Sequence, residues 1–202
     1  MRTLDIEQRS PEWFQAKKGK IGGLRFGQVI SNRKNALVYE LIDETLADAL
    51  FPDDYVDEDM QFGIDNEGIA VEKYTKQSRI EFIETGLIIS DFSAIHVASP
   101  DRISKNRDIV LEVKCTQHGR KQIQRYFEGP ETTHLPQIKN YFATSDDVKE
   151  VHWVSYCPFR PERELVVWIY KREDFEKELP VWREKLEDIE NEVKAKMDMF
   201  CF

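Results

Sequence analysis

Apolar residues follow two patterns along the chain, one typical of amphipathic helices and one typical of buried strands. Residues 36–50 carry leucines at helical spacing, at 37, 41, 46 and 50. Residues 109–111 are a continuous apolar run, Ile-Val-Leu, bounded by polar residues. The first pattern predicts an amphipathic helix and the second a buried strand.

Along the whole chain, such patterns predict seven helices and six strands. The helices are expected over 10–18, 24–30, 36–50, 60–79, 118–128, 135–144 and 173–198, with an acidic loop over 51–59. The strands are expected over 80–84, 86–90, 94–98, 108–115, 150–157 and 164–170. This order predicts an α/β fold class, with a central mixed β-sheet flanked by helices on both faces. At 202 residues, the chain is expected to form one domain, 1–202.

The N-terminal region contains helix-boundary signals and a glycine-rich turn. Ser10 and Pro11 are expected as the N-cap and the first helical residue, and Gly19 as the end of that helix. Lys20-Ile21-Gly22-Gly23 then forms a tight turn into the next helix. Such a turn beside lysines can cradle a phosphate, although two glycines more often form only a turn.

The chemistry of the chain is concentrated around the strand at 108–115. Side chains alternate along a strand, so Glu112 and Lys114 point to one face and Val113 to the other. A charged pair on an otherwise apolar strand is costly unless it is compensated. The expected compensation is a divalent cation together with Asp101, which follows the turn residues Ser99-Pro100.

The residue types fit magnesium. Mg²⁺ prefers hard oxygen ligands and is commonly held by one or two carboxylates. It can acidify a water molecule and stabilise charge on a phosphodiester, with Lys114 beside that water. Pro100-Asp101 followed by Glu112-x-Lys114 looks like the PD-(D/E)xK nuclease motif. The competing interpretation is a buried ion pair in a core strand.

Two similar tripeptides provide internal controls. Asp147-Val148-Lys149 follows a turn-like polar cluster, and Glu192-Val193-Lys194 lies in a charged helical stretch. Only the copy at 112–114 combines an apolar strand with an upstream acid. The other two are expected to be a polar turn and a solvated helix face.

Composition excludes several classes of protein. No apolar run approaches the roughly 18 residues of a membrane span, and the N-terminus shows no signal-peptide pattern. Three widely spaced cysteines argue against a disulfide framework and fit a reducing compartment such as the bacterial cytoplasm. The four histidines do not cluster at zinc-ligand spacing, and Cys115 is expected to pack in the core.

The net charge of −9 is unevenly distributed. Residues 1–34 carry eight Lys/Arg against three acids, and residues 102–126 carry seven against two. Residues 43–84 instead carry thirteen acids against three bases. Two basic segments in an acidic chain suit a localised phosphate-binding surface, although ordinary surface patchiness is the alternative.

One face of the helix at 60–79 combines residues that are unusual for a core. Gly63, Glu67, Ala70 and Tyr74 share that face by their spacing. Glu67 either faces water at the edge of the helix or reaches the metal site as an outer carboxylate.

Six motifs in order support a family resemblance. They are R-S-P-E-W-F, K-K-G-K-I-G-G, G-x-x-x-E-x-x-A-x-x-x-Y, A-S-P-D, L-E-V-K-C and L-P-Q-I-K. Together they resemble the lambda-exonuclease, or YqaJ-type viral recombinase, family of phage nucleases, over nearly the whole chain. The resemblance implies a restriction-endonuclease-like core and an Mg²⁺-dependent 5′→3′ exonuclease that degrades one strand of linear duplex DNA, with Mn²⁺ able to substitute.

The resemblance also implies roles for individual residues. Asp101, Glu112 and the Val113 carbonyl would bind metal, and Lys114 would position or activate water. Glu67 would complete the acidic site, and Gln137 would hold the lysine or the scissile region. The expected 5′-phosphate contacts are Lys17, Lys20 and Arg25.

Assembly and partners are also implied only by the resemblance. The best-known family members form a ring-shaped trimer around the duplex and cooperate with a single-strand annealing protein, and the resemblance implies the same for this chain. Two departures affect end recognition: Leu24 stands where serine is frequent, and Arg102 where glycine is usual. The alternatives are an endonuclease with the same chemistry, restriction-type or junction-cleaving, and a non-catalytic DNA-binding protein on this scaffold.

Overall fold

A five-stranded mixed sheet forms the centre of the molecule. The computed structural model describes residues 1–48 and 57–201. The sheet has the order β2-β5-β6-β7-β8, with β2 Phe82–Ile83, β5 Arg102–Ser104, β6 Ile109–Cys115, β7 Glu150–Tyr156 and β8 Leu165–Lys171. β6 and β7 are parallel and the other neighbours are antiparallel. The sheet is therefore mixed, as the sequence predicts.

A second, smaller sheet lies beside the first. It has the order β1-β3-β4 and is antiparallel throughout, with β1 Arg2–Leu4, β3 Leu87–Ile89 and β4 Val97–Ala98. β4 leads through the turn at 99–101 directly into β5 of the central sheet. The turn that carries Asp101 thus joins the two sheets.

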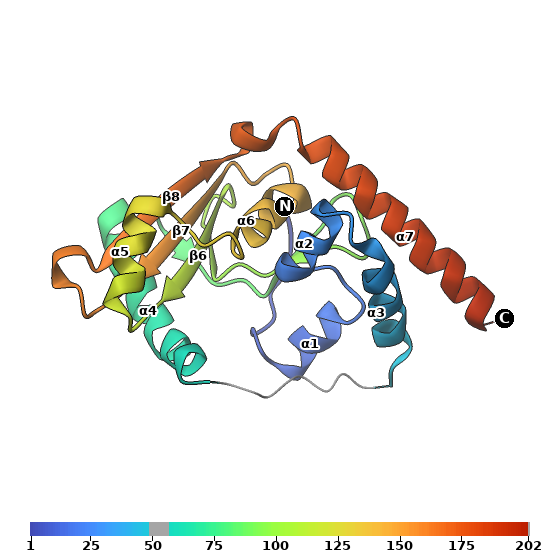
Figure 1. The fold of residues 1–202 in the computed structure, drawn as a ribbon, viewed down its shortest axis with the longest axis horizontal. Helices are drawn as coiled ribbons and strands as arrows, with labels where there is room; N and C mark the ends of the chain where they lie inside the picture. The colour runs from blue at the N-terminus through green and yellow to red at the C-terminus, as the bar shows by residue number, and fades with distance from the viewer. Residues whose placement is uncertain (49–56, 202) are drawn as a thin grey trace.

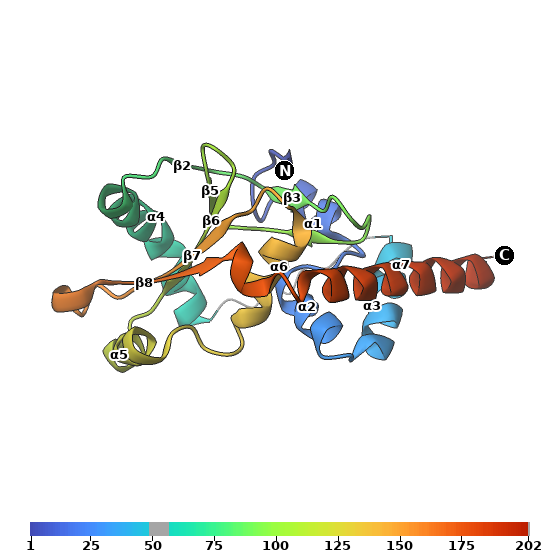
Figure 2. The same ribbon diagram turned by 90° about the horizontal axis from the view of Figure 1, so that it is seen from above.

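Helices cover both faces of the central sheet (Figures 1 and 2). Helix α4 (Glu58–Ser78) lies on one face, while α5 (Gly119–Glu128) and α6 (Leu135–Thr144) lie on the other. Behind α6 pack α2 (Gly23–Ile30), α3 (Lys34–Leu46) and the long α7 (Leu179–Cys201), and α1 (Pro11–Lys17) precedes them. None of the helices described is both long and apolar enough to cross a membrane.

The alternation of β6 divides the core into two clusters. Leu111, Val113 and Cys115 pack with Ala70 and Tyr74 of α4. Val110 belongs to the larger cluster that contains Ile138 and Phe142 of α6. Glu112 and Lys114 therefore point toward the α6 face and Cys115 toward α4, as strand alternation predicts.

Several predicted boundaries are wrong, for identifiable reasons. Strands β1 and β5 were not expected, because three residues with little apolar pattern give no strand signal. The helix expected at 173–198 begins only at Leu179, after a 3₁₀ turn at Arg172–Phe175, because Pro180 lacks an N–H and fits only the first turn of a helix.

The acidic segment near residue 57 also differs from expectation. The predicted helix at 36–50 spans Lys34–Leu46, and its last leucine, Leu50, lies outside the described residues, as does most of the predicted loop over 51–59. Asp57 is not loop but the N-cap of α4, and its side chain accepts the Met60 N–H at 2.7 Å.

Candidate active site

The charged pair on β6 is buried against α6. The Glu112 side chain is only 1% exposed, and Lys114 is 27% exposed. The Lys114 ammonium donates a hydrogen bond to Glu112 Oε1. The two side chains therefore leave the same face of β6 and meet there, as their spacing predicts.

Asp101 joins them through the pairing of β5 with β6. Arg102 pairs with Leu111, so Asp101 lies just before the first β5 residue, opposite Glu112. Its Oδ2 accepts the backbone N–H of Val113 at 2.6 Å. Residues eleven positions apart in sequence are thus brought together where the antiparallel ladder ends.

The electrostatics of this cluster are those of a site short of positive charge. Burial, and then the Glu112 charge, raise the pKa of Asp101 well above its usual value. Burial alone would lower the pKa of Lys114, but the Glu112 and Asp101 carboxylates outweigh it and raise that pKa. Lys114 stays an ammonium, and its single charge does not offset the cost of ionising the buried Asp101 beside Glu112.

Tyr141 is a site residue that the sequence analysis missed. Its hydroxyl donates to Glu112 Oε2, and its own oxygen accepts the Gln137 amide at 3.1 Å. Gln137 therefore reaches Glu112 through Tyr141 rather than contacting Lys114. The four-residue spacing of Gln137 and Tyr141 on α6 was the available signal, since it places both on one helix face.

Glu67 lies on the other face of the sheet from Glu112. It is carried by α4 and accepts a hydrogen bond from Arg102 at 3.2 Å. Arg102 also pairs with Glu84 at 3.0 Å. The Glu67 charge still helps to raise the pKa of Asp101, after burial and Glu112. Arg102, noted as a departure from the family pattern, is therefore the residue that holds Glu67.

The three expected phosphate-binding residues differ in their environments. The Lys17 ammonium lies 3.7 Å from the centre of the Trp13 ring, and burial, followed by the charge of Arg25, lowers its pKa to about 8. Lys20 donates to the Ala94 carbonyl at 2.8 Å. Arg25 forms a two-pronged ion pair with Glu44. The structure thus commits Arg25 to a protein partner.

The glycine-rich turn has two distinct glycines. A Cβ placed on Gly22 would meet nothing within 4 Å, whereas one on Gly23 would lie 2.9 Å from Gln137 Cγ. Gly23 therefore permits the close packing of α2 on α6, directly behind Gln137. Leu24, the other departure, is 75% exposed on the first turn of α2.

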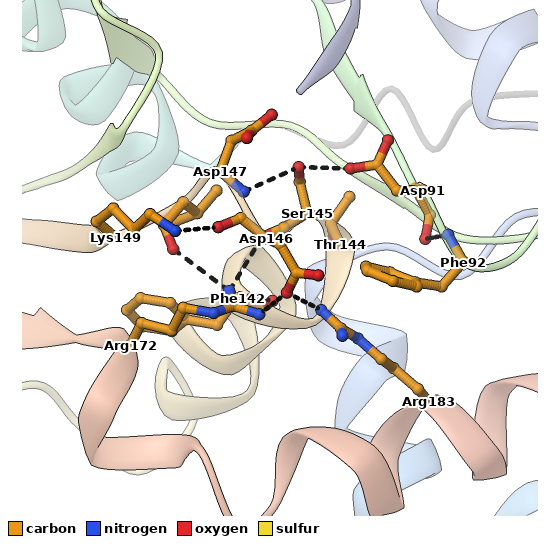
Figure 3. Close-up of polar contacts among 12 residues, drawn as sticks. Asp91, Phe92, Phe142, Thr144, Ser145, Asp146, Asp147, Lys149, Arg172 and Arg183 are labelled. Carbon is orange, nitrogen blue, oxygen red and sulfur yellow. Dashed lines mark hydrogen bonds and ion pairs between the residues drawn. The ribbon is translucent and has the colours of Figure 1, made fainter.

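The control tripeptides lie elsewhere. Figure 3 shows Asp147 and Lys149 in a polar cluster around Ser145 and Asp146, where Lys149 Nζ donates to the Asp146 carbonyl at 2.7 Å. Asp147 pairs with the N-terminal amine. Lys194 is exposed on α7 and Val193 is buried beneath it. Both match the expected polar turn and solvated helix face.

The donor set suits a hard divalent cation. Asp101 and Glu112 offer carboxylate oxygens in a buried cluster with excess negative charge, which a dication would neutralise. Within residues 1–48 and 57–201, no group of three or more His, Cys, Asp or Glu side chains converges as a metal site. Two carboxylates with water and phosphate remain sufficient for Mg²⁺.

Comparison with protein families gives one match. The profile of the YqaJ-like viral recombinase domain matches residues 12–147, about two thirds of the chain. The chain belongs to this family. The match includes Asp101, Glu112, Lys114, Gln137 and Tyr141 within its bounds. Comparison with curated protein sequences gave no match.

Solved structures support the fold of this YqaJ-like protein. An alkaline exonuclease from Laribacter hongkongensis is 23% identical and superposes with a TM-score of 0.79, covering 95% of this chain and 96% of its own. The same exonuclease in complex with dAMP gives a TM-score of 0.78 at 23% identity, over the same shares of the two chains. At this identity the likeness confirms the α/β fold class. The profile match thus shows the family, and the solved structures show the fold.

Proposed function

We propose that this YqaJ-like protein is a Mg²⁺-dependent exonuclease that degrades one strand of linear duplex DNA in the 5′→3′ direction, for phage-type recombination. The observation that carries the proposal is the convergence of Asp101, Glu112 and Lys114 on one face of the sheet. A buried ion pair alone needs no second carboxylate, whereas a cation site does.

Each residue has a role that follows from its contacts. Asp101 and Glu112 hold the cation, with the Val113 carbonyl as a further ligand, and Mn²⁺ substitutes for Mg²⁺. The cation supplies acidification of water and stabilisation of phosphodiester charge. Lys114, kept protonated by its neighbours, orients water by hydrogen bonding and neutralises developing charge. Gln137 and Tyr141 fix the rotamer of Glu112.

The substrate end is held by the N-terminal helices. Lys17 lacks a carboxylate partner within the described residues and is assigned to the 5′-phosphate, with Lys20 beside it. Arg25 binds the 5′-phosphate only if its ion pair with Glu44 opens. Glu67 adjusts the charge of the site from the α4 face. A homotrimer around duplex DNA, an annealing-protein partner and the bacterial cytoplasm complete the proposal, on family grounds.

The test is a digestion series with purified protein. Linear duplex is expected to be degraded with Mg²⁺ and left intact with a chelator, and Lys114→Ala is expected to lower the rate by about 10²–10⁴-fold. Lys194→Ala is the matched control, since it alters the identical tripeptide on α7. Equal cutting of closed circular duplex would establish an endonuclease instead, and equal turnover by Lys114→Ala would remove the assigned chemistry.

A further inference from the structure

Helix α5 has an inverted arrangement of polar and apolar residues. Its inner positions, Gln122 and Arg125, are buried and polar. Its outer positions carry Ile123, Tyr126 and Phe127, which are 50%, 43% and 74% exposed. A surface helix normally buries its apolar stripe. The described part of the chain therefore leaves the outward apolar face of α5 uncovered.

The polar inner face of α5 is bonded to the sheet and to the following loop. The Arg125 guanidinium donates to Ser155 Oγ at 2.9 Å and forms an ion pair with Glu131, also at 2.9 Å. Gln122 donates to the Glu164 carbonyl at 2.9 Å. These bonds hold α5 on the sheet without using its apolar residues.

Arginines border the exposed face. A cavity of about 350 Å³ is lined by Tyr126 and Phe127 together with Arg160, Arg163 and Glu162. The Arg163 guanidinium stacks 4.6 Å from the centre of the Tyr126 ring. Within the described residues, neither arginine has a carboxylate within 4.0 Å. With two arginines and one glutamate, the lining of this cavity carries a net positive charge.

Helix α5, which carries the exposed aromatic residues, contacts strand β6 of the candidate active site. Arg125 donates to the backbone carbonyl of Lys114 at 3.2 Å, so the inner face of α5 touches the residue assigned to water activation. The Tyr126 and Phe127 rings meet edge to face, with centroids 5.0 Å apart. Open aromatic rings beside arginines are the usual combination for stacking successive unpaired bases.

We infer that the outer face of α5, with Arg160 and Arg163, binds single-stranded DNA by base stacking. This inference rests on the proposed function, because removal of one strand leaves the other unpaired beside the site. Inside a duplex each base is stacked on its neighbours, so the aromatic rings are assigned to the unpaired strand, whose bases are free to stack. The arginines contact its phosphates, and Tyr126 and Phe127 take its bases.

The experiment measures binding without hydrolysis. Fluorescence anisotropy with a labelled oligo(dT) 20-mer in chelator gives the affinity of the wild type and of Phe127→Ala. The variant is expected to bind about tenfold more weakly, the loss of one stacked base. An abasic oligonucleotide of equal length should bind both proteins equally. Phe200→Ala, an exposed aromatic on α7, is the matched control and leaves the affinity unchanged.

A second variant tests the charge. Arg163→Gln is expected to lower the slope of log affinity against log salt by about 0.7 for both oligonucleotides, the loss of one phosphate contact. The salt dependence of Arg163→Gln tests the phosphate contact separately from the stacking tested by Phe127→Ala.

Three results would overturn the inference. One is unchanged oligo(dT) affinity in Phe127→Ala. Another is an equal loss for the abasic probe. The third is a change in sedimenting mass in Phe127→Ala, which would make the face a contact between copies or with a protein. The binding assay contains chelator and so does not depend on nuclease activity. A wild type that binds oligo(dT) by stacking but does not digest DNA would contradict only the proposed function. A wild type that digests DNA but does not stack would contradict only this inference.

Discussion

Tyr141 connects two residues that act on the site from different elements. Its hydroxyl lies between the Gln137 amide and Glu112, so it fixes the Glu112 carboxylate without itself contacting a cation. Tyr141→Phe keeps the ring and removes only that hydroxyl. We expect a decrease in activity of about 10–100-fold, or a comparable loss of Mg²⁺ affinity, as for other partners of metal-holding carboxylates.

Tyr74→Phe is the matched control for Tyr141. The Tyr74 hydroxyl bonds His152 Nδ1 at 2.7 Å, on the α4 face of the sheet. Its removal is expected to cost stability but not activity, as measured by urea unfolding and by digestion of linear duplex. Equal loss of activity in both variants would show a general effect of core tyrosine hydroxyls instead.

The Lys17 environment predicts a pH effect on end preference. Burial, with the charge of Arg25, lowers the pKa of Lys17 to about 8, so its ammonium loses its proton as pH rises through that value. Preference for 5′-phosphate over 5′-hydroxyl ends should therefore fall by up to about tenfold between pH 7 and pH 9. Lys17→Arg should abolish this fall, because guanidinium does not titrate there. The readout is the ratio of KM values for the two ends.

At this scale, the sequence predicted what depends on local alternation. Glu112 and Lys114 share a face because strand geometry requires it, and Asp101 was found through its turn. Tyr141 was missed because its contact with Glu112 depends on how α6 lies across the sheet, which no local pattern encodes. The commitment of Arg25 to Glu44 depends likewise on the packing of α2 against α3.

Among the elements, α2 and α6 form the contact that supports Gln137. The two glycines of the N-terminal turn provide a matched pair of substitutions. Gly23→Ala places a Cβ 2.9 Å from Gln137 Cγ, and we expect a loss of about 1–3 kcal/mol in the free energy of unfolding, with lower activity. Gly22→Ala should be nearly neutral in urea unfolding, since its position is open. Equal effects would contradict the assigned packing.

Long periodic elements were predictable and short ones were not. Helices α4 and α6 and strands β6 and β7 carry enough apolar positions to define their period. Strand β5 has three residues and exists because it pairs with β6, so its signal lies in the partner. That pairing places Asp101 beside Glu112. The element that completes the site is therefore one that local sequence does not reveal.

At the scale of the whole molecule, the net charge is acidic, but the basic residues are concentrated in two segments. The first basic segment contains Lys17 and Lys20, and the second contains Lys114 and the arginine of α5 that touches it. The second segment contacts the candidate site through this arginine, and the first carries the residues proposed for the 5′-phosphate. A localised phosphate-binding surface stays a prediction.

The stability of the whole chain should respond to the cation. The folded-state pKa of Asp101 is raised by burial and by Glu112, above its unfolded value near 3.9. A group of this kind favours folding at pH below the unfolded pKa, and that contribution is lost as pH rises through the folded pKa. Without a bound cation, the carboxylate form of Asp101, which is reached as pH rises, therefore opposes folding.

Asp101→Asn removes that opposition while its amide oxygen can still accept the Val113 N–H. We expect the variant to be inactive, yet more stable than the wild type in chelator at pH 8, by about 1–3 kcal/mol. Mg²⁺ at ten times its dissociation constant should stabilise the wild type by about 1.4 kcal/mol, or roughly 3–6 °C in Tm, and leave the variant unchanged. Calorimetric scans with Mg²⁺ or chelator measure both effects. A variant that is less stable in chelator, or that keeps the Mg²⁺ shift, would show that Asp101 does not hold the cation.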